Sequence, residues 1–311
     1  MFGYWNNANP VTKTVPQGYN MKRLGDKLRY RFPVYTVHMD DHIELAYVEQ
    51  GQGQETLLMV HGMGSYLPCW NNNLSPLSEY HRCIAVDLPG YGKSSKDDYP
   101  ATMDFYANVL HEFIQRLDLP YVNLVGHSMG GQIALTFALK YPDAVKKIIL
   151  SAPAGFEEYT KSEKEMIAQM ITANAIKRSS VREITDNLKY NFYQLPPEAE
   201  FMIQDRIDMR YADDFDWYCT TVARSVMGMT EKLMVPHLAD IRHPVLIFFG
   251  ENDNLIPNRF IHKGTTRELA RKGTAILPNA ELIMADRTGH FAHFEQSGPF
   301  NFAVRYFINN H

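Results

Sequence analysis

The segment NLVGHSMGGQIAL, residues 123–135, places Ser128 among glycines, directly after an apolar run and directly before an apolar, helix-like pattern. A tight turn from a strand into a helix forces its central residue into a strained conformation and requires small neighbours, which Gly126, Gly130 and Gly131 provide. A serine at such a turn is exposed at the end of the strand, with a helix amino terminus beneath it. We therefore predict that Ser128 is a nucleophile; an ordinary turn or helix cap is the alternative.

An attacking serine needs a general base, and the base needs an acidic residue that orients it. Asp253 follows the apolar run VLIFFG, and His290 follows the apolar run ELIMAD. Loops at the carboxyl ends of parallel strands form the usual sites of α/β proteins, so Asp253 and His290 are the candidate acid and base. Glu251 and Asp286 are alternative partners for His290.

A developing negative charge on a substrate oxygen needs hydrogen-bond donors. The segment MVHGMGS follows another apolar run, and its glycines allow the backbone to approach a ligand closely. We expect the backbone amides of Met63 and Met129 to converge on such an oxyanion; a turn at the end of a strand is the alternative. His61 and His127 are expected to pack and hydrogen bond rather than transfer protons.

A scaffold that brings these loops together is predicted by the alternation of strands and helices. Residues 34–39 and 43–49 alternate in polarity and predict a hairpin. Continuous apolar runs between amphipathic helical patterns, one of them preceded by the N-cap candidate Thr102, are typical of a parallel sheet covered on both faces. The runs are 56–60, 83–88, 122–126, 146–152, 245–250 and 281–286. The predicted fold class is α/β.

From residue 156 to residue 240 this alternation stops, and we predict a helical lid inserted between strands of the sheet. Ser162 with Glu165 predicts a capping box at its first helix. The predicted organisation is an N-terminal arm at 1–33, the first part of the core at 34–155, the lid at 156–240 and the second part of the core at 241–311.

The predicted lid is rich in methionine and aromatic residues. Individually these side chains are expected to be core residues, and together they predict an apolar, adaptable ceiling over Ser128. They are Met166, Met170, Tyr190, Phe192, Tyr193, Phe201, Met202, Met209, Tyr211, Phe215, Trp217, Met227, Met229 and Met234. An acyl or aromatic substrate is therefore favoured over a sugar or a phosphate.

Composition and motif spacing limit the partners. The formal charge of −4 and the isoelectric point of about 6.3 arise without a basic stripe, so nucleic acid is not expected. Two glycine-rich segments depart from nucleotide-binding motifs, DLPGYGKS at Asp87 and GMGSYL at Leu67, so no cofactor is predicted. His293 follows His290 by three residues without further ligands, so no metal is expected.

Cysteine usage and hydropathy address the compartment. Cys69, Cys83 and Cys219 are scattered and read as buried residues rather than as a disulfide framework. No run of about 18 apolar residues predicts a membrane span, and the first 20 residues lack the pattern of a leader peptide. We expect a soluble protein, cytoplasmic by default, or periplasmic or secreted if a leader has been removed. A homo-oligomer is left open.

Several motifs together resemble those of the α/β-hydrolase fold superfamily, specifically lid-bearing members related to bacterial esterases and carbon–carbon bond hydrolases. They are HGMG, DLPGYGKS, GHSMGG, GENDNLIP and GHFAHFE, and both their order and their spacing fit. The resemblance runs from about residue 34 to the C-terminus. It implies a mostly parallel, eight-stranded sheet flanked by helices, with an inserted helical lid.

The resemblance also implies the roles of the site residues. Ser128 is the implied nucleophile, Asp253 the acid, His290 the base, and Met63 and Met129 the oxyanion-hole donors. The implied activity is hydrolysis of a carboxylic ester of a small to medium apolar substrate through an acyl-enzyme, without a cofactor. Epoxide hydrolases and haloalkane dehalogenases carry aspartate at the nucleophile position, so the serine argues against both.

Two alternative functions stay open. One is hydrolysis of a carbon–carbon bond in a vinylogous diketone, in which a lid arginine reads an acidic substrate; Arg206, Arg210 and Arg224 are available, or are solvated helix charges. Some of those relatives carry asparagine where His127 stands, which is a weak argument against it. The other is a binding protein that senses a small molecule with the same fold.

Overall fold

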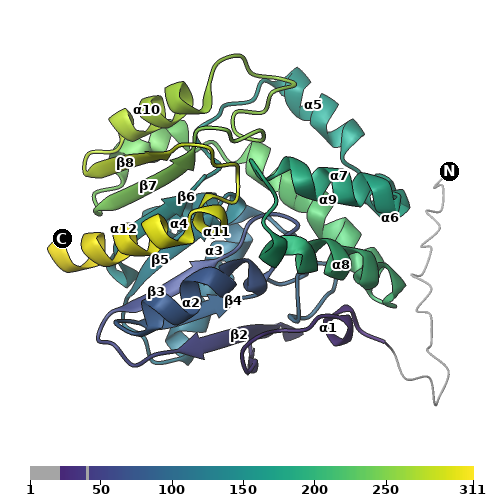
Figure 1. The fold of residues 1–311 in the computed structure, drawn as a ribbon, viewed down its shortest axis with the longest axis horizontal. Coiled ribbons are helices and arrows are strands. Elements are labelled where there is room, and N and C mark those ends of the chain that lie inside the picture. Colours follow the sequence, from purple (N-terminus) through teal and green to yellow (C-terminus); the bar gives the residue numbers. More distant parts are fainter. Residues whose placement is uncertain (1–21, 40–41) are drawn as a thin grey trace, which may run out of the picture.

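The computed structural model describes residues 22–39 and 42–311, so most of the predicted arm, residues 1–21, lies outside the described residues. In the described part, eight strands form one sheet in the order β1-β2-β4-β3-β5-β6-β7-β8 (Figure 1). The strands are β1 (Tyr35–His38), β2 (Glu44–Gln50), β3 (Thr56–Val60), β4 (Arg82–Val86), β5 (Val122–His127), β6 (Val145–Ser151), β7 (Val245–Gly250) and β8 (Ala280–Ala285).

Most strand pairs in the sheet are parallel. β1 pairs antiparallel with β2, as the predicted hairpin requires, and β2 pairs antiparallel with β4. Every other pairing, from β4–β3 to β7–β8, is parallel. The predicted fold class, a mostly parallel eight-stranded sheet flanked by helices, is confirmed.

Helices cover both faces of the sheet. Along β3, Leu57 and Met59 face one apolar cluster, whereas Leu58 and Val60 face the other, because successive side chains of a strand point to opposite sides. α2, α11 and α12 contribute to the first cluster, and α3, α4 and α10 to the second (Figure 1). The α-helices outside the region between β6 and β7 in the described residues are α1 (Leu24–Lys27), α2 (Asn71–Ser78), α3 (Met103–Arg116), α4 (Met129–Lys140), α10 (Thr266–Ile276), α11 (Ala292–Glu295) and α12 (Ser297–Asn310).

The chain between β6 and β7 is helical, and residues 161–240 are called the helical insertion below. Its α-helices are α5 (Lys161–Met170), α6 (Ala173–Arg178), α7 (Val181–Tyr190), α8 (Glu200–Asp208) and α9 (Phe215–Glu231). They lie beyond one end of the sheet strands, on the right of the view in Figure 1. The boundaries of the predicted lid and its role as a lid stay predictions.

The predicted capping box at the start of the insertion is wrong by two residues. Thr160, not Ser162, is the N-cap of α5: its Oγ1 accepts the Glu163 N–H, and the Glu163 carboxylate accepts the Thr160 N–H at 2.6 Å. Ser162 lies inside the first helical turn, where Glu165 cannot complete a box with it. In contrast, the predicted cap of α3 is confirmed, since Thr102 accepts the Phe105 N–H.

The expectation that the methionine and aromatic residues of the insertion are core residues holds only in part. Phe192, Met202, Met209, Phe215 and Met234 are buried. Met166, Met170, Tyr190, Tyr193, Tyr211 and Trp217 are exposed. α5 buries only one of its residues, Ile167, which fits a helix packed on one side alone.

All three cysteines lie in the described part of the chain and are buried. Cys69, Cys83 and Cys219 are free thiols. Burial raises the pKa of Cys83 and of Cys219 to about 12, and it raises the pKa of the Cys69 thiol further. Among the described residues, no helix is long and apolar enough to span a bilayer.

Candidate active site

Ser128 lies at the turn from β5 into α4, and its backbone adopts φ 53° and ψ −117°. Side chains rarely adopt this positive φ, so the predicted strained conformation is confirmed. Close packing explains the glycines: a Cβ at Gly126 would overlap the Gly130 carbonyl oxygen, and a Cβ at Gly130 would overlap the Val60 carbonyl oxygen. The turn is thus wedged between β3 and the first residues of α4.

Asp253 and His290 form a buried hydrogen-bonded pair. Asp253 Oδ2 accepts from His290 Nδ1 at 2.8 Å, and the two side chains are 0% and 4% exposed. The other carboxylate oxygen, Oδ1, accepts the N–H groups of Leu255 and Ile256 at 2.8 and 3.1 Å. Because the carboxylate only accepts, Nδ1 of His290 carries a proton and the neutral ring presents Nε2 as a proton acceptor.

The alternative acids, Glu251 and Asp286, contact other residues than His290. Glu251 forms an ion pair with Arg267. Asp286 is exposed, and its nearest basic group is the guanidinium of Arg287 at 3.8 Å. Neither carboxylate hydrogen bonds to His290 among the described residues. Of the three candidates, Asp253 is therefore the carboxylate that hydrogen bonds to the imidazole in this structure.

Two backbone donors next to the serine are unpaired. Gly62 packs against the nucleophile turn, since a Cβ on it would lie 3.0 Å from Cβ of Ser128. Within the described part of the chain, the N–H groups of Met63 and Met129 donate to no other group. Met129 opens α4, so its amide also belongs to the positive end of a helix dipole. These two donors are available to an anionic oxygen bound beside Ser128.

The orientation of the Met63 amide is set by the peptide before it. The Leu88 N–H donates to Nε2 of His61 at 3.0 Å, so Nδ1 carries the proton and donates to the Gly62 carbonyl at 2.8 Å. The Ser65 N–H donates to the same carbonyl at 3.1 Å. Because the Gly62 C=O and the Met63 N–H are on opposite sides of one planar peptide, both bonds direct the Met63 N–H away from His61.

His127 connects the turn at Ser128 with the loop that carries His290. Its Nε2 donates to the His290 carbonyl at 3.1 Å, and the two rings lie 4.8 Å apart. His293 lies behind them, with its ring 4.5 Å from that of His127 and its Nδ1 3.1 Å from Ser151 Oγ. His127 therefore has the packing and hydrogen-bonding role that was predicted for it.

Burial keeps these supporting histidines neutral. Loss of solvation lowers the pKa of His61, places the pKa of His127 well below its usual value, and lowers that of His293 to about 3. Among the residues that the structure describes, no hydrogen bond joins the Ser128 hydroxyl to His290. Such bonds are often long in the absence of substrate and tighten in the reactive complex.

Comparison with known proteins identifies the family. The alpha/beta hydrolase fold family matches this chain over residues 55–297. The chain belongs to this family. It is a hydrolase of the α/β fold, whose specific substrate the family does not define.

Two relatives and one solved structure illustrate the range of this hydrolase family. The dihydrolipoyllysine-residue acetyltransferase component of the acetoin cleaving system of Cupriavidus necator is 27% identical over 84% of this chain, which spans 65% of that protein. The 2-hydroxy-6-oxononadienedioate/2-hydroxy-6-oxononatrienedioate hydrolase 1 of Pseudomonas putida is 26% identical over 87% of this chain and 94% of its own length. A probable hydrolytic enzyme of Pseudomonas aeruginosa PAO1 shares the fold, with a TM-score of 0.81 at 22% identity over 92% of this chain and 98% of the other.

Sequence reasoning missed the hydrogen bonds by which the helical insertion of this hydrolase fixes the loop that carries His290. The Asn191 carbonyl, just after α7, accepts the N–H of His290 at 2.7 Å. The Glu295 carboxylate accepts the N–H groups of Tyr193, Gln194 and Gly289 at 2.6–3.1 Å, which ties the insertion to the same loop. The motif GHFAHFE contains Glu295 and Gly289, but the other two partners of Glu295 lie 101 and 102 positions away in the chain.

Asp87, which departs from the nucleotide-binding pattern in DLPGYGKS, is fully buried and joins three segments. Its carboxylate accepts the N–H of Leu67 at 2.7 Å, the N–H of Lys93 at 2.8 Å and the hydroxyl of Tyr30 at 2.5 Å. A Cβ on Gly92 would overlap this carboxylate. The motif therefore fixes the chain that follows the Met63 loop.

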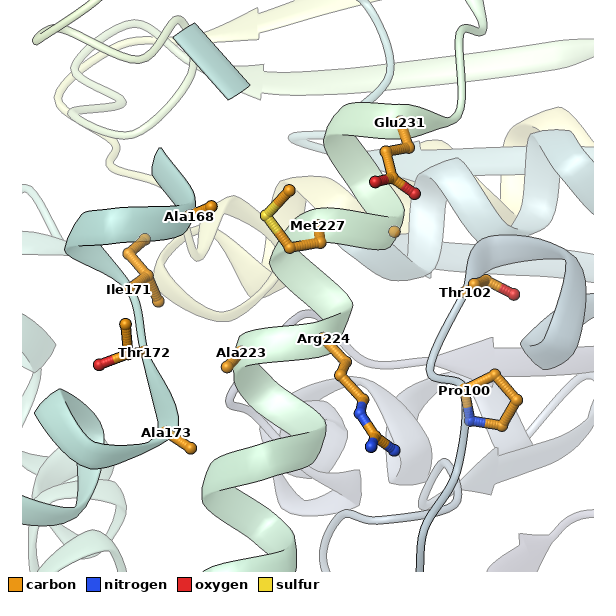
Figure 2. Close-up of a pocket in the computed structure, with 11 residues that line it drawn as sticks. Pro100, Thr102, Ala168, Ile171, Thr172, Ala173, Ala223, Arg224, Met227 and Glu231 are labelled. Atoms are coloured by element: carbon orange, nitrogen blue, oxygen red, sulfur yellow. The ribbon is translucent and has the colours of Figure 1, made fainter. Parts of the chain in front are cut away.

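A cavity of about 500 Å³ lies between α5, α6 and α9 and the loop before α3. Figure 2 shows Met227 directed toward Ala168 and Arg224 directed toward Pro100. The lining residues are Pro100, Thr102, Ala168, Ile171, Thr172, Ala173, Ala223, Arg224, Met227, Gly228 and Glu231. Since Ser128 and His290 do not line it, this cavity is separate from the candidate catalytic residues.

Proposed function

We propose that this hydrolase cleaves a carboxylic ester of a small to medium apolar substrate through an acyl-enzyme on Ser128. The observation that carries the proposal is the pair of unpaired amides, Met63 and Met129, beside a strained, glycine-flanked serine. The oriented Asp253–His290 pair supports it. Together they are the parts that acyl transfer needs.

In the first half of the reaction, Nε2 of His290 takes the proton of the Ser128 hydroxyl while Oγ forms a bond to the substrate carbonyl carbon. The carbonyl oxygen becomes an oxyanion and accepts hydrogen bonds from the Met63 and Met129 amides. Asp253 stabilises the imidazolium that has formed. When the tetrahedral intermediate collapses, the imidazolium gives its proton to the departing alcohol.

In the second half, water replaces the alcohol. His290 removes a proton from water, the hydroxide oxygen attacks the acyl carbon, and the same two amides hold the oxyanion. Collapse breaks the bond to Oγ and returns the proton from the imidazolium to Ser128, which releases the acid. No step in this sequence needs a cofactor.

Apolar side chains from the helical insertion support an apolar substrate. The Tyr218 hydroxyl lies 3.4 Å from the Gly64 carbonyl, and the ring of Phe201 lies 6.5 Å from that of Tyr66. Both bring aromatic surface next to the loop that carries Met63. A substrate with an acyl chain or aromatic group would bury surface there.

The test is initial-rate hydrolysis of p-nitrophenyl esters from acetyl to long acyl chains, with Ser128→Ala measured at equal concentration. Turnover that depends on Ser128 is the expected result, and the optimal chain length would report the depth of the acyl pocket. Folded protein that turns over none of these esters would contradict the proposal.

Carbon–carbon bond hydrolysis is the second candidate, because the P. putida relative is named for that activity. Two of the arginines considered for an acidic substrate have protein partners: Arg206 donates to the Gly64 carbonyl, and Arg224 pairs with Asp98 at 2.7 Å and donates to the Tyr99 carbonyl at 2.7 Å. Cleavage of a vinylogous diketone, with no ester turnover, would favour this candidate. Ligand-induced stabilisation without turnover of either substrate would favour a binding protein.

A further inference from the structure

The loop that carries Met63 is held from outside by one helix of the insertion. The oxyanion loop, residues 62–66, contacts α8 at two points. The Tyr66 hydroxyl donates to Asp205 Oδ2 at 2.6 Å, and the guanidinium of Arg206 donates to the Gly64 carbonyl. Asp205 and Arg206 are consecutive residues, and Tyr66 lies 139 positions from Asp205 in the chain. One short piece of α8 therefore holds the middle and the C-terminal end of this loop.

The contact at Gly64 reaches the Met63 amide through two peptide planes. The Gly64 carbonyl and the Ser65 N–H belong to one rigid peptide unit, so the bond from Arg206 fixes the direction of the Ser65 N–H. That N–H donates to the Gly62 carbonyl, which belongs to the same rigid peptide unit as the Met63 N–H. Turning the Gly64 carbonyl away would break the Ser65 bond and leave the Gly62 carbonyl with the bond from His61, so the Met63 amide would be held less firmly.

The Gly64 carbonyl finds its hydrogen-bond partners outside the loop. Gly64 has a φ of +63°, and its carbonyl accepts from the guanidinium of Arg206 on α8. Within the residues that the structure describes, two side chains donate to the Gly64 carbonyl: Arg206 and, more weakly, the Tyr218 hydroxyl of α9 at 3.4 Å. A guanidinium is a charged donor, and charge-assisted hydrogen bonds are about twice as strong as neutral ones. The hydrogen bond from Arg206 is thus the stronger of the two bonds to the Gly64 carbonyl.

The second contact is buried and excludes water. Tyr66 is 8% exposed and Asp205 9% exposed. Burial raises the pKa of the Asp205 carboxyl, whereas the hydrogen bond from Tyr66 acts in the opposite direction. A carboxylate in this position keeps the phenol in place only while α8 is packed against the loop.

We propose that Asp205 and Arg206 are positioning residues, which complete the alignment of the Met63 amide with the oxyanion when α8 is docked on the oxyanion loop. The inference rests on the proposed function, in which the Met63 amide is an oxyanion donor. The helical insertion then does more than cover a substrate, because its docking completes the catalytic site. Arg206 acts through the backbone rather than on the substrate.

The test measures kcat and KM for a p-nitrophenyl ester with Arg206→Met, Arg206→Lys and Tyr66→Phe, with Gln204→Ala as control on the exposed side of α8. Losing one oxyanion donor costs roughly 100-fold or more in kcat, so a misaligned donor in Arg206→Met should lower kcat about tenfold with KM unchanged. Arg206→Lys should restore most of kcat, and Tyr66→Phe should lower it about threefold. An unchanged kcat with a raised KM in Arg206→Met would mean that Arg206 binds substrate, and would overturn the inference.

Amide hydrogen exchange separates this inference from the proposed function. In Arg206→Met, the Ser65 amide, which donates to the Gly62 carbonyl, should exchange at least tenfold faster than in the parent protein, while the amides of α4 are unchanged. This result is independent of which bond the enzyme cleaves. If the parent shows no Ser128-dependent ester turnover, the proposed function fails, and exchange alone decides the inference. Equal exchange rates at Ser65 would overturn it.

Discussion

Two parts of the site are held in different ways. The turn at Ser128 is shaped mainly by near neighbours, through a positive φ at Ser128 and the close approach of Gly126 to Gly130, and it also packs against Val60 of β3. The Asp253–His290 pair joins loops that are 37 positions apart and is held by hydrogen bonds to further segments, including the Asn191 carbonyl. The first part follows largely from local backbone geometry, whereas the second depends on tertiary structure throughout. The two parts should therefore fail differently when they are changed.

The largest effect is expected at the nucleophile itself. Ser128→Ala removes the attacking oxygen, so kcat should fall about 10⁶-fold. The packing of the turn at Ser128 is not changed by this substitution, so the melting temperature should stay within about 2 °C of the parent. Steady-state kinetics and a thermal melt check both values. A variant that keeps more than a tenth of the parent rate would remove Ser128 from the mechanism.

A smaller loss of kcat is expected when the Asp253–His290 pair is changed. Asp253→Asn keeps the shape of the side chain but alters the proton arrangement at Nδ1 of His290, so kcat should fall about 10⁴-fold. Glu251→Gln is the matched control, because Glu251 pairs with Arg267 instead; its kcat should stay within about threefold of the parent. If Glu251→Gln were the more damaging change, the acid would be wrongly assigned.

The packing of the turn against β3 predicts a stability effect. Gly130→Ala places a Cβ against the Val60 carbonyl oxygen, and relieving that overlap should cost about 1–3 kcal/mol of unfolding free energy. Gly298 is the comparison, because a Cβ there meets no atom within 4 Å. Urea denaturation of both alanine variants measures the difference. Equal stabilities would mean that the packing around the turn adjusts without cost.

The smallest expected effect is a loss of stability at low pH, which involves the buried histidines His127 and His293. His127 and His293 are buried and neutral, with pKa values lowered by burial, that of His293 to about 3. In the unfolded chain both titrate near pH 6.5, so the unfolded state binds more protons below that pH and stability falls as the pH is lowered from about 6.5 toward 3.

The expected loss at pH 5.5 is about 1 kcal/mol for each of these histidines. Urea denaturation at pH 7.5 and at pH 5.5 measures it in the parent and in His293→Gln. The glutamine variant does not titrate, so it should lose less stability between the two pH values than the parent. A parent that is more stable at pH 5.5 would contradict the neutral assignment.

The sequence predicts those features that depend on neighbours in the chain. The strands, the α/β class and the conformation of Ser128 follow from apolar runs and from the glycines beside the serine. The loops after parallel strands offered Asp253 together with Glu251 and Asp286, and the choice of Asp253 as partner of His290 came from the resemblance to the hydrolase family. The catalytic roles of these residues stay predictions until the variants are measured.

What could not be predicted depends on distant pairs. Nothing in the sequence places β2 next to β4 rather than next to β3. The start of α5 was misplaced because both Thr160 and Ser162 precede a glutamate by three residues, and only the backbone decides between them. Arg206 was expected to read substrate or solvent, and its bond to Gly64 becomes visible only when α8 is docked.

The buried thiols of Cys69, Cys83 and Cys219 make this protein suitable for site-specific labelling. With pKa values raised by burial, they present no reactive thiolate to a maleimide at neutral pH. A cysteine introduced at the exposed position of Gln204 would then carry a fluorophore without removal of the native thiols. Anisotropy of that label would follow α8 in solution, and slow labelling of the native thiols would report opening of the fold.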